Sequence, residues 1–195
     1  YRSRIKFNLE GDQTVGSPLN VNRGIKVDLE TPDTLSLAVK HQINDKWAVL
    51  GDYTWTGWSS LQSLEPMVKS DGSRAVAPLR YNFKDTYRVG LGAIYKLNDQ
   101  WMLRAGTAYD KNPIPNDASR TMAVPDADRV WLALGAKWTI TPKASLDIGY
   151  AHVFVKDSHT ERQVKNTSET ATLQTVRGKF TNSADMLSLQ LNYAF

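Results

Sequence analysis

Apolar side chains alternate with polar or small ones along much of the chain. In the segment 101–110, Trp101, Leu103 and Tyr109 occupy odd positions, whereas Arg104 occupies an even one. A period of two is typical of a β-strand whose two faces meet different surroundings. The period of an amphipathic helix is missing, so we predict an all-β, antiparallel fold. The alternation predicts eight strands: 1–10, 33–43, 46–60, 84–97, 100–110, 128–140, 143–156 and 180–195.

The connections between these strands are alternately short and long. The tight turns contain turn-forming residues and are Asn44-Asp45, Asn98-Asp99 and Thr141-Pro142. The long polar segments are 11–32, 61–83, 111–127 and 157–179. If consecutive strands are antiparallel, all short turns lie at one end and all long segments at the other. This arrangement is typical of an outer-membrane β-barrel, with short periplasmic turns and long outer loops.

Aromatic side chains are concentrated near the ends of the predicted strands. Trp47, Trp101 and Trp138 lie close to the short turns, whereas Tyr53 and Tyr87 lie close to the long segments. Two aromatic belts separated by aliphatic and small residues are typical of a barrel in a bilayer. The alternative is a soluble antiparallel β-sandwich, which has no reason to confine its aromatic residues to two belts. We therefore predict a transmembrane β-barrel.

Composition narrows the classes of function. The longest stretch without Asp, Glu, Lys or Arg is 53–64, far shorter than the about 20 apolar residues of a membrane-spanning helix. The net charge is only +4 and the basic residues form no run, so we expect no nucleic-acid partner. The chain has no cysteine, which excludes a disulfide framework and a thiolate metal site.

The longest sequence blocks resemble one family, the FadL-like outer-membrane transporters of long-chain fatty acids and aromatic hydrocarbons. The chain also ends in Phe195 after alternating apolar residues, which resembles the assembly signal of outer-membrane barrels. The blocks are 54–59 (TWTGWS), 83–92 (FKDTYRVGLG), 103–115 (LRAGTAYDKNPIP) and 124–132 (VPDADRVWL), and the resemblance covers roughly 1–195.

This resemblance implies a monomeric 14-stranded barrel in the outer membrane, with an N-terminal hatch and passive uptake of hydrophobic small molecules. The chain would then be the C-terminal part of one barrel domain, with the last eight of the fourteen strands, and the hatch would precede Tyr1. The expected partners are the hydrophobic substrate, outer-membrane lipid and, through Phe195, the outer-membrane assembly machinery. The alternative is a small closed eight-stranded barrel with a structural or adhesive role, acting through its outer loops.

Strand parity places a set of charged residues on the lumenal side. A charge on the lipid face would cost about 2–4 kcal/mol at the bilayer midplane, so these side chains indicate which face is lumenal. They are Asp52, Arg88, Lys96, Arg104, Asp110, Arg129, Lys137 and Asp147. One interpretation is a self-satisfied network that stabilises the barrel. The other is that Arg88, Arg104, Asp110 and Arg129 line the polar part of the substrate route, where an arginine can bind a carboxylate bidentately.

Leu79 and Arg80 are further candidates for ligand binding. In the fatty-acid members of the resembled family, a lysine shortly before the Phe-Lys-Asp block helps to hold the acid headgroup. The equivalent place before Phe83 falls on Leu79, with Arg80 next to it. This departure weakens the expectation of a fatty-acid substrate and favours a neutral one, such as a monoaromatic hydrocarbon.

The sequence predicts neither an enzyme nor a cofactor. None of His41, His152 and His159 has a serine and an acid at convincing inward positions, so we expect no catalytic residues. No spacing supports a metal site. The acidic residues of segment 11–32 and its neighbour Asp33 are best explained as a solvated outer loop, although they could hold Ca²⁺.

Overall fold

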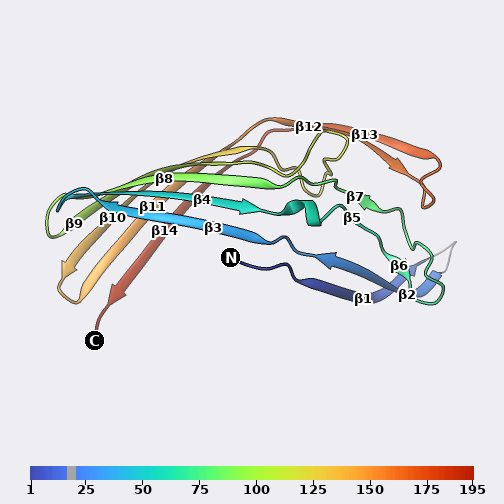
Figure 1. Ribbon diagram of the computed structural model, residues 1–195, viewed down its shortest axis with the longest axis horizontal. Helices are drawn as coiled ribbons and strands as arrows, with labels where there is room; N and C mark the ends of the chain where they lie inside the picture. Colours follow the sequence, from blue (N-terminus) through green and yellow to red (C-terminus); the bar gives the residue numbers. More distant parts are fainter. Residues whose placement is uncertain (17–20) are drawn as a thin grey trace.

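The computed structural model consists mainly of β-strands and describes residues 1–16 and 21–195 (Figure 1). One short 3₁₀ helix, η1 (Trp58–Ser60), interrupts the strands, and no helix among the described residues is long and apolar enough to cross a membrane. The strands are β1 (Lys6–Val15), β2 (Val21–Glu30), β3 (Thr34–Gln42), β4 (Trp47–Thr56), β5 (Ser63–Leu64), β6 (Met67–Val68), β7 (Leu79–Arg80), β8 (Thr86–Lys96), β9 (Trp101–Asp110), β10 (Arg129–Thr141), β11 (Ala144–Val155), β12 (Ser158–Lys165), β13 (Thr172–Phe180) and β14 (Ser183–Tyr193).

Seven strands form one antiparallel sheet in the order β14-β11-β10-β9-β8-β4-β3. They correspond to seven of the eight predicted strands. The registers place like-facing residues opposite each other, for example Leu37 opposite Tyr53 and Leu134 opposite Tyr150. The sheet is open, because β3 and β14 are each paired on one side only within the described residues. The structure is therefore part of a barrel wall and not a closed eight-stranded barrel.

The prediction that a strand at 1–10 belongs to this sheet is wrong. Strand β1 begins at Lys6, continues to Val15 and pairs with β2, inside the predicted loop 11–32. Among the described residues, the N-terminal segment is joined to the main sheet by an isolated bridge, in which the backbones of Arg2 and Thr34 exchange hydrogen bonds of 2.8 and 2.9 Å. Alternation predicts that a segment will pair as a strand, but it does not specify the partner. Part of the predicted loop 11–32, residues 17–20, lies outside the described residues.

Short turns and long connections lie at opposite ends of the sheet, as predicted. Figure 1 shows the β3–β4, β8–β9 and β10–β11 turns gathered at one end together with the C-terminus. At the other end, the long connections fold into small sheets of their own: β1-β2-β6, β5-β7 and the β12-β13 hairpin. We refer to this end as the loop end.

The two faces of the sheet differ as the alternation predicts. Apolar side chains such as Leu37, Leu134 and Leu189 are more than half exposed on the outer face, where lipid would cover them. Aromatic pairs lie near both ends of the strands. Trp101 stacks on Trp138 near the short turns, with ring centroids 5.7 Å apart, and a row of tyrosines follows the loop end. The two predicted belts are therefore present.

Candidate functional site

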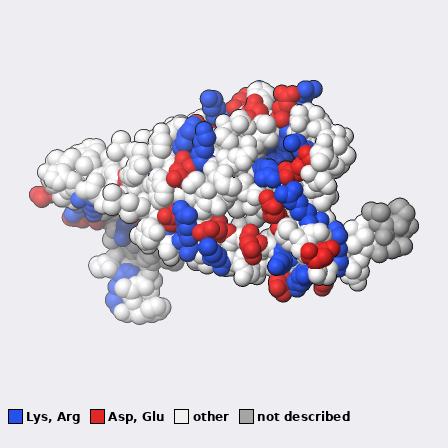
Figure 2. Space-filling view, turned by 45° about the vertical axis from the view of Figure 1, so that its right-hand side comes forward, with Lys and Arg blue, Asp and Glu red and all other residues white. Residues whose placement is uncertain are grey.

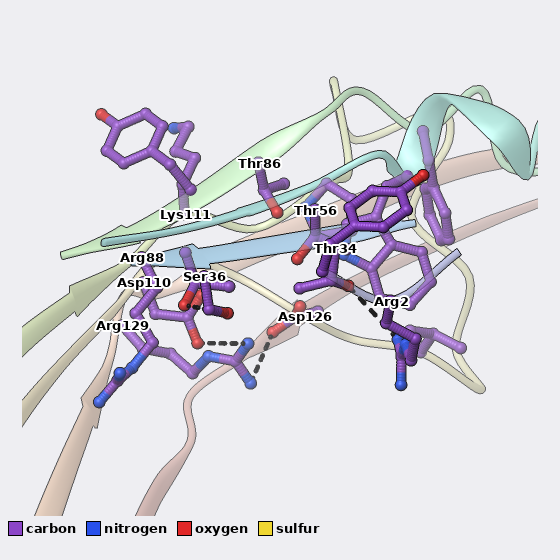
Figure 3. Close-up of a pocket in the computed structure, with 17 residues that line it drawn as sticks. Arg2, Thr34, Ser36, Thr56, Thr86, Arg88, Asp110, Lys111, Asp126 and Arg129 are labelled. Carbon is purple, nitrogen blue, oxygen red and sulfur yellow. Dashed lines mark hydrogen bonds and ion pairs between the residues drawn. The ribbon is translucent and has the colours of Figure 1, made fainter. Parts of the chain in front are cut away.

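Three of the predicted site residues lie in one row across the inner face. Arg88 on β8 is opposite Asp110 on β9, and Asp110 is opposite Arg129 on β10. The row lies where these strands meet the long connections, and Figure 3 shows the three side chains close together. An arginine–aspartate–arginine row places two cations beside one acid, so further acids are needed for neutrality.

Those acids come from a neighbouring strand and from a loop. Arg88 donates from Nη1 to Oδ1 of Asp52 on β4 at 2.7 Å. Arg129 pairs with Asp110 at 3.1 Å and with Asp126, from the loop before β10, at 3.5 Å. Each of the two arginines is therefore neutralised within the chain, which supports the interpretation as a self-satisfied network.

Gly90 creates the space that the first of these pairs needs. Its position on β8 is opposite Asp52, and a Cβ atom there would collide with the Asp52 carboxylate. Because glycine has no side chain, the carboxylate can lie over the strand and reach Arg88 on the same side. Glycine in a strand often marks such a close approach.

The loop acid beside Arg129 lies in a partly dry environment. Burial raises the pKa of Asp126, while the positive charge of Arg129 and a hydrogen bond from the Ala127 amide act in the opposite direction. A carboxylate that is buried beside an arginine gains more from that arginine than an exposed one would. Asp126 therefore attaches the end of the loop to the row of charges.

Asp128, two residues further on, connects the two ends of loop 111–127. One of its carboxylate oxygens accepts hydrogen bonds from the Tyr109 hydroxyl at 2.9 Å and the Lys111 ammonium at 2.7 Å. The other accepts from the Asn112 backbone at 3.1 Å and from the Asn112 side chain. Burial opposes ionisation, but these donors lower the pKa of Asp128 from 3.8 to about 2. We call this arrangement the Asp128 clasp.

A cavity of about 680 Å³ lies over the row of charges at the loop end. Its charged lining consists of Arg2, Arg88, Asp110, Lys111, Asp126 and Arg129, all labelled in Figure 3. The rest of the lining is aromatic, hydroxyl-bearing or aliphatic: Tyr1, Trp58, Phe83, Tyr87, Thr34, Ser36, Thr54, Thr56, Thr86, Pro113 and Val124. Trp58 and Phe83 pack edge to face with centroids 5.8 Å apart. Such a lining suits a largely apolar molecule with a small polar group. We call this space the lumenal cavity.

Arg104 is on the same face but further toward the short turns. It pairs with Asp147 at 2.9 Å and borders a separate depression of about 790 Å³ that contains Gly106, Gly135 and Gly149. Arg104 therefore does not meet the other predicted site residues.

Leu79 and Arg80 lie on β7, among the outer loops, and do not line the lumenal cavity. Arg80 donates from Nε and Nη2 to both carboxylate oxygens of Glu169, each at 2.6 Å. Figure 2, in which the loop end faces forward, shows basic and acidic side chains side by side across this end. The six predicted site residues thus fall into three places.

Sequence reasoning missed the loop contributions to the lumenal cavity. The predicted strand 46–60 included Trp58, but β4 ends at Thr56 and Trp58 begins the 3₁₀ helix η1. Phe83 ends the predicted loop 61–83, and strand parity gives no direction to a side chain in a loop. Asp126 also lies in one of these blocks. Its spacing of three residues from Arg129 was a signal for the ion pair between the two. Nothing local indicates that Glu169 meets Arg80, because the two are 89 residues apart.

The described residues contain no group of three or more His, Cys, Asp or Glu that could hold a metal ion. Two acids near the predicted loop 11–32 are instead bound to basic residues, since Arg4 pairs with Asp33 at 3.0 Å and approaches Glu30 at 4.0 Å. His152 pairs with Asp185 at 2.7 Å on the outer face of the sheet, away from the lumenal cavity.

Comparisons with known proteins all point to the same family. The model of the family described as "Outer membrane protein transport protein (OMPP1/FadL/TodX)" matches residues 1–195. Outer membrane protein P1 of Haemophilus influenzae is 34% identical over an alignment of 201 positions, which covers 100% of this chain and 43% of that protein. The long-chain fatty acid transport protein of Escherichia coli K12 is 28% identical over 169 residues, covering 78% of this chain and 37% of that one.

Solved structures agree with this assignment. The crystal structure of a Pseudomonas aeruginosa FadL homologue superposes with a TM-score of 0.84 at 27% identity, covering 98% of this chain and 47% of that one. The chain thus spans less than half the length of each of these three relatives.

Proposed function

Since its whole length matches the family model, this chain belongs to the outer-membrane transport family of OMPP1, FadL and TodX, and we propose that the whole protein takes up hydrophobic small molecules passively. The observation that carries the proposal is the lumenal cavity. It combines aromatic walls with Arg88 and Arg129, each of which is paired with an acid, on the inner face of a sheet whose outer face is apolar. A surface of this kind lets an apolar molecule pass without trapping it by charge.

The proposed substrates are long-chain fatty acids or aromatic hydrocarbons. The name of the Escherichia coli relative supports the first class. The pairing of Arg88 and Arg129 with acids of the same chain supports the second, because a substrate carboxylate would have to compete with those acids for the two guanidinium groups. Transport of this kind needs no covalent step and no cofactor.

The protein is proposed to be a monomer in the outer membrane, with this chain as the C-terminal part of one barrel. Two observations support the part of this proposal that makes the chain one piece of a larger barrel: the open edges of β3 and β14, and the greater length of the relatives. Unpaired edges are not tolerated in hydrocarbon, so further strands would have to complete the wall. Lipid would cover the apolar outer face, and the exposed Phe195 would be available to the assembly machinery.

A pair of neighbouring substitutions on β3 tests the proposal. Ser36 lines the lumenal cavity, whereas Leu37 next to it is 61% exposed on the outer face. In the purified full-length protein, Ser36→Trp should weaken binding of a radiolabelled alkylbenzene or long-chain fatty acid by roughly tenfold or more, because it fills the cavity. Leu37→Trp adds a similar side chain on the lipid side and should leave binding unchanged. Equal effects of the two substitutions would contradict a lumenal binding site.

A further inference from the structure

Two arginines of the loop end converge on one carboxylate. Arg80 binds both oxygens of Glu169 at 2.6 Å, and Arg74 donates from Nη1 to Oε2 of the same group at 3.1 Å. Glu65 is a more distant partner, at 3.4 Å from Arg74 and 3.9 Å from Arg80. Parallel N–H···O contacts of this kind are the geometry with which arginine recognises carboxylates in general. Hydrogen bonds from Arg80, together with both positive charges, lower the pKa of Glu169 from 4.5 to about 2, so this carboxylate is ionised at neutral pH.

The tip of the β12–β13 hairpin holds Glu169 in this position. Glu169 has a backbone φ of +58°, in the left-handed region that non-glycine residues seldom adopt. The turn is fixed by Asn166, whose carbonyl accepts from the Glu169 amide at 2.9 Å and whose side chain accepts from the Thr170 amide at 2.9 Å. The surrounding contacts therefore hold the backbone in an unfavourable conformation that directs the side chain toward the arginines.

A second cavity, of about 380 Å³, opens beside this ion pair. Its charged lining consists of three cations, Arg80, Arg162 and Lys165, and one acid, Glu169. The rest of the wall includes apolar side chains such as Leu79 and Val164. Glu169 thus lies where the headgroup of an anionic amphiphile would lie if its tail followed the apolar wall. We call this space the outer-loop cavity.

We propose that Glu169 is a selectivity residue, a built-in carboxylate that occupies the arginine pair and so disfavours acidic substrates relative to neutral ones. This inference rests on the proposed function and names the substrate class as neutral. An incoming acid must displace a partner on the same chain, whose effective concentration is in the millimolar range or above. A neutral molecule does not compete for the arginines, so it gains access to the apolar wall without that penalty.

The test is binding of dodecanoate and of dodecanol by the full-length protein and its Glu169→Ala variant. Removing the built-in carboxylate should strengthen binding of dodecanoate by roughly tenfold, as expected for a new charge-assisted contact, and leave dodecanol unchanged. Adding Arg80→Ala should abolish the gain, because the released guanidinium is the group that binds the acid.

Glu161→Ala is the matched control. Glu161 lies on the same hairpin and binds Arg177 at 2.6 Å, but it does not line the outer-loop cavity. This variant should change neither affinity. The inference is overturned if Glu169→Ala leaves dodecanoate binding unchanged, or if it raises both affinities equally, which would indicate a merely opened loop. Absence of dodecanol binding in the parent protein would instead count against the proposed function.

Discussion

Neutralising Asp128 should loosen loop 111–127 without unfolding the barrel wall. Asp128→Asn keeps the size of the side chain but removes its charge and half of its acceptor capacity. The ammonium of Lys111 and the hydroxyl of Tyr109 both donate to one oxygen of Asp128, at 2.7 and 2.9 Å, and an amide in its place satisfies them poorly. The ends of the loop then lose their common partner.

The pKa of Asp128 sets the size of the effect. A fall from 3.8 to about 2 corresponds to roughly 2 kcal/mol of preference for the charged form. The side chain keeps 17% of its surface exposed, so solvent screening reduces this to about 1–2 kcal/mol. The folded-state pKa lies below the unfolded one, so the stabilisation is present above pH 3.8 and is lost as the pH falls through about 2.

Hydrogen exchange of the full-length protein in detergent measures this directly. A loss of about 1.4 kcal/mol raises the population of the open loop, and hence the exchange rate of its protected amides, roughly tenfold at neutral pH. The control is Asp99→Asn at a short turn, where a 96% exposed carboxylate pairs with Lys96 and solvent screens the pair, so exchange should stay unchanged. Unchanged exchange across 112–127 in Asp128→Asn would refute the assignment of Asp128 as a clasp.

Three further substitutions test the inner face and the loops. Gly90→Ala should displace the Asp52 carboxylate from Arg88 and lower the melting temperature, whereas insertion into the membrane should persist; loss of insertion alone would argue against this steric role. Arg104→Leu should alter ligand uptake or thermal stability but leave insertion intact, because this side chain faces the lumen; defective insertion with normal uptake would show that its facing is wrong. Arg120→Ala should expose the β12–β13 hairpin to proteases, because the buried Arg120 side chain donates a hydrogen bond to the His159 carbonyl. Protease resistance equal to that of the parent protein would count against that contact.

The strands of the main sheet were predictable because a wall between lipid and lumen imposes a strict period of two. Segments 84–97 and 100–110 match β8 and β9 within a few residues for this reason. The same period occurs in β1, which pairs with β2 outside the sheet, so periodicity identified a strand but not its neighbour. Whether such a segment belongs to the membrane-spanning sheet depends on its contacts with other strands, which the period alone does not give.

The candidate site was predictable only where it lies on strands. Parity placed Arg88, Asp110 and Arg129 on one face, and the registers then bring them into one row. The loop acids could not be placed in this way, because a side chain in an irregular segment has no fixed direction. Glu169 shows this most clearly, since its contact with Arg80 depends on how two separate connections pack at the loop end.

Uptake by living cells tests the proposed transport most directly. The full-length protein is expressed in Gram-negative cells that lack their own long-chain fatty acid transporter, and accumulation of a radiolabelled alkylbenzene and of a long-chain fatty acid is followed over time. We predict uptake of the alkylbenzene several-fold above cells carrying empty vector, and its loss in Ser36→Trp but not in Leu37→Trp. Uptake of both compounds at the empty-vector level, with the folded protein present in the outer membrane, would contradict the account.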